Sequence, residues 1–83
     1  MKKITVKIES YGAIKKQLPP DLTLTFAHEV LVADILQDVL QAYPDCDSAL
    51  EKCACAIGED IIPRHLQIHT DSTIVLLSPV AGG

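Results

Sequence analysis

The sequence predicts an α+β fold in which a mixed sheet of about five strands is covered by one main helix. Three patterns predict it. Apolar residues alternate with polar ones early in the chain, recur at helical spacing in the middle, and form a continuous run near the end. A helix with one apolar side must bury that side against another layer, and a sheet provides it. The 83 residues are enough for one domain with a modest core.

The first part of the chain predicts two strands. Every second side chain in residues 4–9 is apolar, so one face of this strand is expected to be buried, with the inward residues Ile4, Val6 and Ile8. Residues 22–26 alternate in the same way. Gly12 and the segment 19–21 mark a loop between the two runs. We therefore expect an antiparallel pair joined by a longer loop.

The middle of the chain predicts the main helix. Its apolar residues recur at steps of three and four along one face: Val32, Ile35, Leu36, Val39, Leu40 and Tyr43. Pro44 should end this helix, because the residue before a proline is pushed out of the helical region. Leu31 offers no capping oxygen at the start. Asp47 is expected to cap a short second helix that runs to about Lys52.

The second half predicts further strands. Residues 53–57 form a compact apolar run before a turn at 58–60, and residues 61–63 are expected to form a brief edge strand. Residues 65–68 are ambiguous. The continuous apolar run at 73–77 is typical of a central strand. A strand pair, a covering helix and then strands ending in a central one is the plan of a β-grasp, or ubiquitin-like, domain, which we expect over residues 1–78.

Composition excludes several classes of protein. The formal net charge of -4 argues against nucleic-acid binding, and an apolar run of membrane-spanning length is absent from the sequence. The basic residues at the start lie in an alternating pattern, which predicts a strand and not a signal peptide. Three cysteines do not suggest a disulfide framework, so we expect a cytoplasmic protein.

The cysteines and histidines are expected to be structural. Cys53 and Cys55 share one face of a strand, where cysteine packs as a small apolar side chain, and the paired spacing of a zinc site is missing. His65 and His69 are expected at the surface. We therefore predict no metal site. The role of Cys46 is left open.

The segment 79–83 is the most informative for function. It follows the strongest predicted strand and contains small residues that end in Gly82 and Gly83. Glycine is costly to order, so a Gly-Gly end suits a thin tail that threads where a Cβ atom would collide. A frayed chain end is the alternative explanation.

Three segments carry a resemblance to a known family. They are Pro79-Val80-Ala81-Gly82-Gly83, Tyr11-Gly12-Ala13-Ile14-Lys15-Lys16 and Leu50-Glu51-Lys52-Cys53-Ala54-Cys55-Ala56-Ile57. With them the chain resembles the MoaD/ThiS family of ubiquitin-like sulfur carriers, and within it the branch that provides the small subunit of molybdopterin synthase. Ser78 stands where that family usually has the first of two prolines.

The resemblance implies a carrier that is not catalytic alone. A MoeB-like partner using ATP and magnesium would adenylate Gly83, and a sulfur-donor protein would convert it to a thiocarboxylate. The tail would then enter a MoaE-like large subunit, in a heterotetramer, and deliver sulfur to cyclic pyranopterin monophosphate. Catalytic side chains would belong to the large subunit, and this chain would hold no permanent cofactor.

The expected roles are specific to position. Gly83 would carry the reacting group, and the residues threading with it would be Gly82, Ala81, Val80 and Pro79. Tyr11, Lys15 and Leu77 would contact the partner. The alternatives are that Tyr11 and Leu77 pack inside and that Lys15 lies in a solvated turn.

Other functions remain open at this point. The same tail suits sulfur transfer for thiazole or cysteine synthesis, or conjugation to proteins as a ubiquitin-like modifier. A passive β-grasp interaction module with a frayed end is a further alternative.

Overall fold

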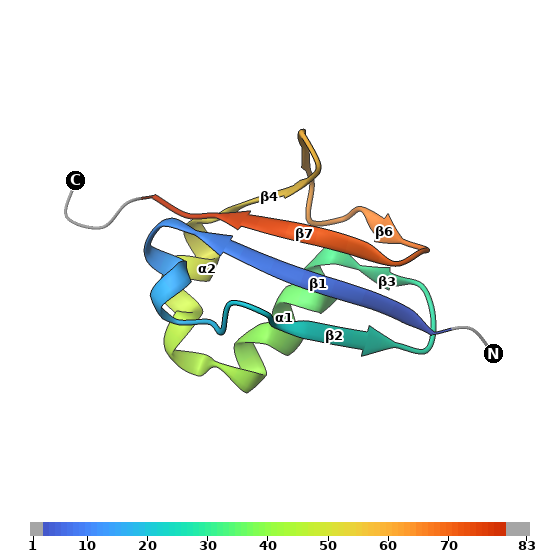
Figure 1. Cartoon of the computed structure of the whole chain (residues 1–83), viewed down its shortest axis with the longest axis horizontal. Helices are drawn as coiled ribbons and strands as arrows, with labels where there is room; N and C mark the ends of the chain where they lie inside the picture. The colour runs from blue at the N-terminus through green and yellow to red at the C-terminus, as the bar shows by residue number, and fades with distance from the viewer. Residues whose placement is uncertain (1–2, 80–83) are drawn as a thin grey trace.

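The computed structural model describes residues 3–79, and its centre is a mixed sheet in the order β2-β1-β7-β4-β5. A separate two-stranded sheet pairs β3 with β6 (Figure 1). The elements in chain order are β1 (Ile4–Tyr11), η1 (Gly12–Lys16), β2 (Thr23–Phe26), β3 (Val30–Leu31), α1 (Val32–Ala42), η2 (Pro44–Cys46), α2 (Asp47–Lys52), β4 (Ala54–Ile57), β5 (Asp60–Ile62), β6 (Gln67–Ile68) and β7 (Ser72–Leu77). The expected β-grasp fold is confirmed.

The strand pairing agrees with the sequence pattern. β1 pairs antiparallel with β2, with Val6 opposite Leu24, and parallel with β7, with Ile8 opposite Ile74. β7 also pairs antiparallel with β4, where Cys55 lies opposite Leu76. β7 is therefore central, as its apolar run predicted, and β5 is an edge strand.

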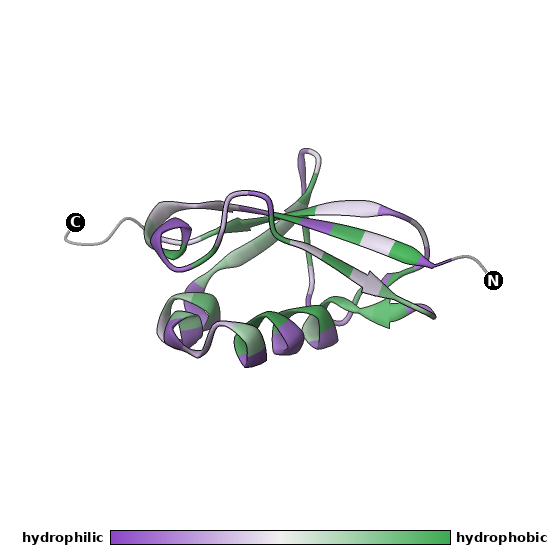
Figure 2. Cartoon of the chain, turned by 60° about the horizontal axis from the view of Figure 1, so that its bottom comes forward, coloured by the Kyte–Doolittle hydropathy of each residue, from purple (hydrophilic) through white to green (hydrophobic). Residues whose placement is uncertain are grey.

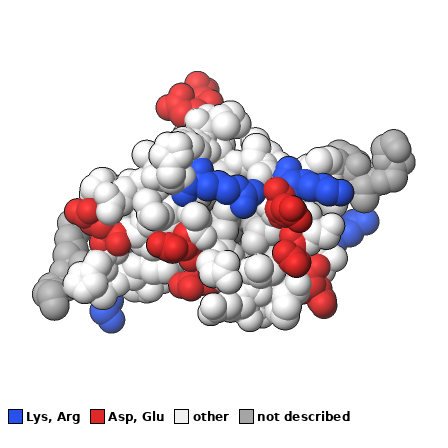
Figure 3. All heavy atoms as spheres, turned by 180° about the vertical axis from the view of Figure 1, so that it is seen from behind, with Lys and Arg blue, Asp and Glu red and all other residues white. Residues whose placement is uncertain are grey.

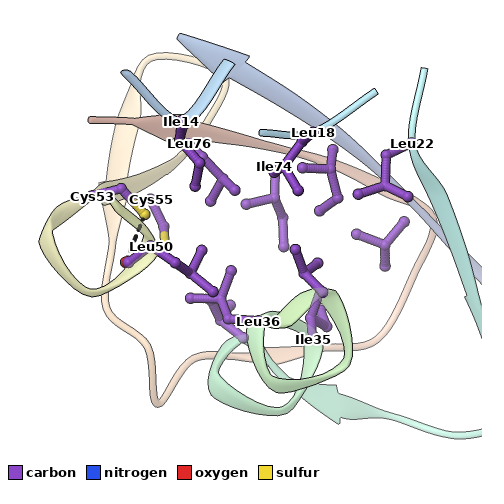
Figure 4. Packing of buried hydrophobic residues seen from close by; sticks show 14 of the residues in the cluster. Ile14, Leu18, Leu22, Ile35, Leu36, Leu50, Cys53, Cys55, Ile74 and Leu76 are labelled. Carbon is purple, nitrogen blue, oxygen red and sulfur yellow. Dashed lines mark hydrogen bonds between the residues drawn. The ribbon is translucent and has the colours of Figure 1, made fainter. Parts of the chain in front are cut away.

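One face of the sheet holds the core. Figure 2 shows the hydrophobic side of α1 turned toward the sheet and its hydrophilic side turned away. Figure 4 shows side chains from α1 pointing toward those of β7 and η1 across this interior. The side chains that meet there are all fully or almost fully buried: Ile14, Ile35, Leu36, Ile74 and Leu76. Burial of apolar area of this kind is the main force holding helix to sheet.

The start of α1 is capped by tertiary contacts. The backbone N–H of Val32 donates to the carbonyl oxygen of Leu66 at 2.9 Å, and that of Ala33 donates to Arg64 at 2.8 Å. These bonds satisfy helix N–H groups that otherwise need a side-chain cap. The sequence showed no capping side chain at the start of α1. The carbonyl oxygens of the segment before β6 take the place of that cap.

Several local features differ from what the sequence predicted. Asp47 is the first residue of α2, not its cap, because the 3-10 turn η2 already bends the chain and places Cys46 at the cap position. The loop after β1 contains η1, which was not predicted. The ambiguous residues before β7 form β6, which pairs with β3. β4 begins at Ala54, one residue later than expected, because Cys53 ends α2.

Charged side chains are scattered over the surface. On the face seen in Figure 3, basic and acidic groups lie among uncharged ones, and acidic groups stand out on the projecting part of the molecule. Glu59, in the turn between β4 and β5, and Asp60, the first residue of β5, are exposed. Among residues 3–79, helices of membrane-spanning length and hydrophobicity are absent.

Candidate functional site

The end of β7 is the candidate site, because the Gly-Gly segment follows it in the sequence. Ser78 and Pro79 come directly after the strand. β7 is held by β1 on one side and by β4 on the other, with Leu77 opposite both Tyr11 and Ala54. A strand paired on both sides is a rigid point of departure. The expected threading residues Val80, Ala81 and Gly82, and the expected reacting residue Gly83, lie outside the described residues.

Four hydrogen bonds hold Ser78 and Pro79 against the start of η1. The Ser78 N–H donates to the Tyr11 carbonyl oxygen at 3.0 Å, and the Ser78 hydroxyl donates to the same oxygen at 2.9 Å. The Ile14 N–H donates to Ser78 Oγ at 2.8 Å, and the Ala13 N–H donates to the Pro79 carbonyl oxygen at 3.3 Å. We call this set of contacts between 11–14 and 78–79 the Ser78 lock.

Gly12 completes the Ser78 lock by its lack of a side chain. Its φ of 84° is in the left-handed region, which side chains disfavour. A Cβ atom at this position would collide with the Ser78 carbonyl oxygen and would lie only 2.8 Å from Ser78 Oγ. Gly12 is thus required both by its backbone conformation and by the close approach of the strand end.

The expected partner residues gather around the lock. Tyr11 and Leu77 are adjacent across the β1–β7 pair, and their side chains are 49% and 39% exposed. Lys15 is also exposed, and it lines with Tyr11 a groove of about 360 Å³ that extends to Pro19. The structure therefore brings the three residues to one end of the sheet, with both apolar side chains at the surface and not in the core.

A second groove borders the lock at Ala13, Ser78 and Pro79. It measures about 370 Å³ and lies between η1, α2 and the pair Ser78 and Pro79. Asp45 and Lys52 line it and give it one charge of each sign. The residues that follow β7 thus line this second groove, while Tyr11, opposite Leu77, lines the first.

The three cysteines belong to the core. Cys46, Cys53 and Cys55 are free thiols and are buried. Burial raises the pKa of the Cys46 thiol. Contact with Cys55, followed by burial, raises the pKa of the Cys53 thiol, which donates to the Leu50 carbonyl oxygen at 3.1 Å (Figure 4). A raised pKa keeps the Cys46 and Cys53 thiols protonated, whereas the hydrogen bond with Cys53 lowers the pKa of Cys55 to about 7. The burial of all three side chains in the core fits a structural role.

The histidines lie at the surface, as expected. His65 is exposed, and His69 Nδ1 lies 3.1 Å from an oxygen of Glu29, with both side chains more than half exposed. Within residues 3–79, clusters of three or more side chains suited to holding a metal ion are absent.

The Ser78 lock itself was missed by reasoning from the sequence. Ser78 was noted only as a departure from a proline, and Gly12 only as part of a loop and of a segment that resembles the family. One signal was present: a serine follows a buried strand directly and precedes Pro79. Its hydrogen-bond partners lie more than 60 positions away in the chain, so the sequence could not identify them.

The comparison with solved structures agrees on the fold. SAMP1 from Haloferax volcanii superposes with a TM-score of 0.81 at 12% identity, covering 95% of this chain and 99% of that one. The small archaeal modifier protein SAMP1 from Methanosarcina acetivorans gives 0.76 at 18% identity, and the match covers all of both chains. At these identities the likeness shows the fold alone.

A third structure is more similar in sequence. It is the complex of subunits 1 and 2 of molybdopterin-converting factor from Helicobacter pylori. The matched chain has a TM-score of 0.66 and 25% identity, with 96% of this chain and all of that chain covered. The comparison with curated proteins gave no significant match.

The family comparison is decisive, because its match includes both sides of the Ser78 lock and continues through the Gly-Gly segment. The model of the ThiS family matches residues 11–83, which is most of the sequence. The chain belongs to the ThiS family and is a ubiquitin-like sulfur carrier of the ThiS/MoaD type.

Proposed function

We propose that this chain is the sulfur-donating small subunit of a molybdopterin synthase. Gly83 carries the sulfur as a C-terminal thiocarboxylate and delivers it to cyclic pyranopterin monophosphate inside a large subunit. The observation that carries the proposal is the firmly held exit at Ser78 and Pro79, from which the Gly-Gly segment continues. The likeness to a chain of the Helicobacter pylori molybdopterin-converting factor complex supports this destination.

The chemistry requires activation by another protein. A terminal carboxylate is an anion at neutral pH and resists attack by a nucleophile. A MoeB-like enzyme, using ATP and magnesium, joins the Gly83 carboxylate to AMP and releases pyrophosphate. A sulfur-donor protein then supplies sulfur at the oxidation level of sulfide, which attacks the Gly83 carbonyl carbon. A C–S bond forms, the bond to AMP breaks, and AMP leaves behind a thiocarboxylate. This chain supplies the reacting group and its position, and the large subunit supplies the catalytic side chains.

The tail acts by threading. Pro79 and Val80 begin the tail, and Ala81 and Gly82 keep it thin enough for a narrow channel. The five residues 79–83 span about 16–18 Å when extended, which is enough to enter a partner's active site. The proposed arrangement is a heterotetramer of two small and two large subunits. A cytoplasmic location fits the three free thiols, because disulfides form mainly in oxidising compartments.

Tyr11, Leu77 and Lys15 form the proposed docking surface. The two apolar side chains are exposed next to the tail exit, where contact with a partner would remove them from water. Lys15 would pair with acidic groups of the partner. We expect Leu77→Ala to weaken binding of the large subunit, measured by titration calorimetry. Leu31→Ala is a matched control, because Leu31 is 37% exposed but lies in the β3–β6 sheet.

The test is reconstitution from purified parts. The chain is combined with the adenylating enzyme, a sulfur donor, the large subunit and the pyranopterin precursor, and molybdopterin is assayed. Intact-protein mass spectrometry checks that Gly83 is the C-terminal residue and that sulfur replaces one of its oxygens. We expect product only when the thiocarboxylate has formed. Removal of Gly82 and Gly83 should abolish it.

A bulky residue at the tail tests threading. Gly82→Leu should abolish transfer and leave the unfolding midpoint unchanged, because Gly82 comes after the last core residue, Leu76, in the sequence. Gly58→Asn is the matched glycine control, since Gly58 faces open space and asparagine tolerates its φ of 61°. Unchanged transfer by Gly82→Leu would contradict threading. A thiocarboxylate that forms but yields no molybdopterin would assign the carrier to another pathway, such as thiazole synthesis, cysteine synthesis or protein modification.

A further inference from the structure

We propose that Ser78 is a positioning residue that fixes Pro79 and so sets the point from which the last four residues leave the domain. The consequence for sulfur transfer rests on the proposed function. The fixation itself rests on the contacts of the described residues and can be tested without any partner.

The Ser78 hydroxyl joins two backbone groups on either side of Gly12. It accepts a hydrogen bond from the Ile14 N–H at 2.8 Å and donates one to the Tyr11 carbonyl oxygen at 2.9 Å. Ile14 is completely buried, and its N–H is at the start of η1, where the helix supplies no acceptor. Without the hydroxyl, this donor would lose its partner in a partly buried place, which costs more than an exposed bond.

The same contact extends to Pro79 through the backbone. The Ala13 N–H donates to the Pro79 carbonyl oxygen at 3.3 Å, one residue beyond the serine. Gly12 lies against the Ser78 carbonyl group with no room for a Cβ atom. The hydroxyl therefore holds the loop closed on the strand end, and the closed loop holds Pro79.

The position of the last fixed residue decides how far Gly83 can move. If Pro79 is fixed, four residues follow it, with an extended reach of about 13 Å. If the chain were free after Leu77, the last residue of β7, six residues would follow, with a reach of about 20 Å. Fewer free residues place the Gly83 carboxyl group in a smaller volume. Reacting groups are sensitive to such placement, since an error of about 1 Å can reduce a rate roughly 100-fold.

The first experiment measures amide hydrogen exchange by NMR in wild type, Ser78→Ala, Ser78→Thr and Ser72→Ala. We expect Ser78→Ala to accelerate exchange of the Ile14 and Ala13 amides roughly tenfold or more, as local opening becomes easier. The Gln17 amide, which donates to Ile14 within η1, is an internal control and should change by less than about twofold. Ser78→Thr keeps the hydroxyl and should restore protection.

Ser72→Ala is the matched serine control. Ser72 begins the same strand, and its hydroxyl also donates to one backbone oxygen, that of Thr70 at 2.9 Å. It lies at the opposite end of β7 from Pro79. We expect the Ala13 and Ile14 amides of the Ser72→Ala variant to exchange at the same rates as in wild type.

The second experiment measures ATP–pyrophosphate exchange catalysed by the adenylating enzyme, with this chain as substrate. We expect Ser78→Ala to lower kcat roughly 10- to 100-fold, with KM within about twofold of wild type, because the docking surface is intact but the carboxyl group is poorly placed. Inserting one glycine between Pro79 and Val80 should lower kcat strongly in wild type. The same insertion should have little further effect in Ser78→Ala, whose tail has already lost its fixed origin.

The outcomes separate the two levels of the proposal. Unchanged Ala13 exchange in Ser78→Ala would show that Pro79 is held without the serine and would overturn the proposal. Faster exchange with unchanged kcat, or equal effects of the insertion in both backgrounds, would overturn the positioning role. If wild type is not adenylated at all, the proposed function fails, while the exchange rates still decide whether Ser78 fixes Pro79.

Discussion

The two ends of β7 are held in different ways. At its start, the Thr5 N–H donates to an exposed Asp71 carboxylate at 2.8 Å, and the Ser72 hydroxyl bonds to the nearby Thr70 oxygen. At its end, Ser78 bonds to residues more than 60 positions away, around a glycine with no space for a side chain. Both ends use polar side chains. Only the end that leads to the tail combines them with close packing.

The two ends of β7 differ in whether water can replace a hydrogen bond that is lost. When a mutation removes the side chain of an exposed hydrogen bond, water can take its place as the partner, so little stability is lost. At the Ser78 lock, the Ile14 amide is partly buried and Gly12 leaves no room for adjustment. The start of β7 can therefore vary at small cost in stability, whereas the end at Ser78 cannot.

The largest expected effect is that of Gly12→Ala compared with Gly58→Ala. Both glycines have positive φ, of 84° and 61°, so both variants are strained. Gly58 faces open space, so Gly58→Ala should lower the unfolding free energy by about 1 kcal/mol, as measured by urea denaturation. Gly12→Ala must also displace Ser78 and should lose about 3 kcal/mol. Equal losses would show that the strand end moves aside easily.

Ser78→Ala compared with Ser72→Ala should give the next largest effect. We expect a loss of about 1–3 kcal/mol for Ser78→Ala, because the Ile14 N–H is left without its acceptor in a partly buried place. Ser72→Ala should change the unfolding free energy by less than about 0.5 kcal/mol. Chemical denaturation of both variants measures the difference, and a larger loss for Ser72→Ala would reverse the comparison.

Asp71→Ala tests the exposed end directly. It removes the acceptor of the Thr5 N–H, which water can replace, so we expect a loss of about 0.5–1 kcal/mol. Asp60→Ala controls for the change in charge, since Asp60 is also exposed and is the first residue of the edge strand β5. A loss above that of Ser78→Ala would mean that the start of β7 is the more important end.

The smallest effect concerns the core between the two ends and depends on pH. Burial raises the pKa of Cys46, so the folded protein keeps this thiol protonated while the unfolded chain releases the proton at alkaline pH. The stabilisation is complete below the ordinary thiol pKa and is lost as pH rises above it. Between about pH 8 and pH 9, the unfolding free energy of Cys46→Ala should therefore fall by about 0.5 kcal/mol less than that of wild type.

A second buried residue provides the control for this pH experiment. Val39 is also completely buried but does not titrate. Val39→Ala should lower stability by a similar cavity mechanism and leave the pH dependence unchanged. The idea fails if Cys46→Ala and wild type lose stability in parallel as pH rises.

Much of the fold could be predicted from periodicity. The alternation in residues 4–9 and the helical spacing around Ile35 and Val39 each correspond to a face that is buried in the structure. The continuous apolar run around Ile74 correctly indicated the central strand. These patterns are local, because each repeats with the period of its own element.

The short elements could not be predicted in this way. β3 and β6 have two residues each, which is too few for a period, and they form because they pair with each other. The start of α1 lacks a capping side chain because Arg64 and Leu66 provide carbonyl oxygens to it. Partners that lie some 30 positions apart leave no trace in a local pattern.

The features of the candidate site likewise fall into those that the sequence predicted and those that only the structure revealed. The sequence by itself determined the β-grasp elements and the Gly-Gly segment, and it identified Tyr11, Lys15 and Leu77 as candidates for partner contact. Only the tertiary structure decided that these three lie together and that Ser78, Gly12 and Ile14 fasten the strand end. The physical reason is that periodicity reports which face of an element is buried. Hydrogen-bond partners and steric limits depend on which distant segments meet when the chain folds.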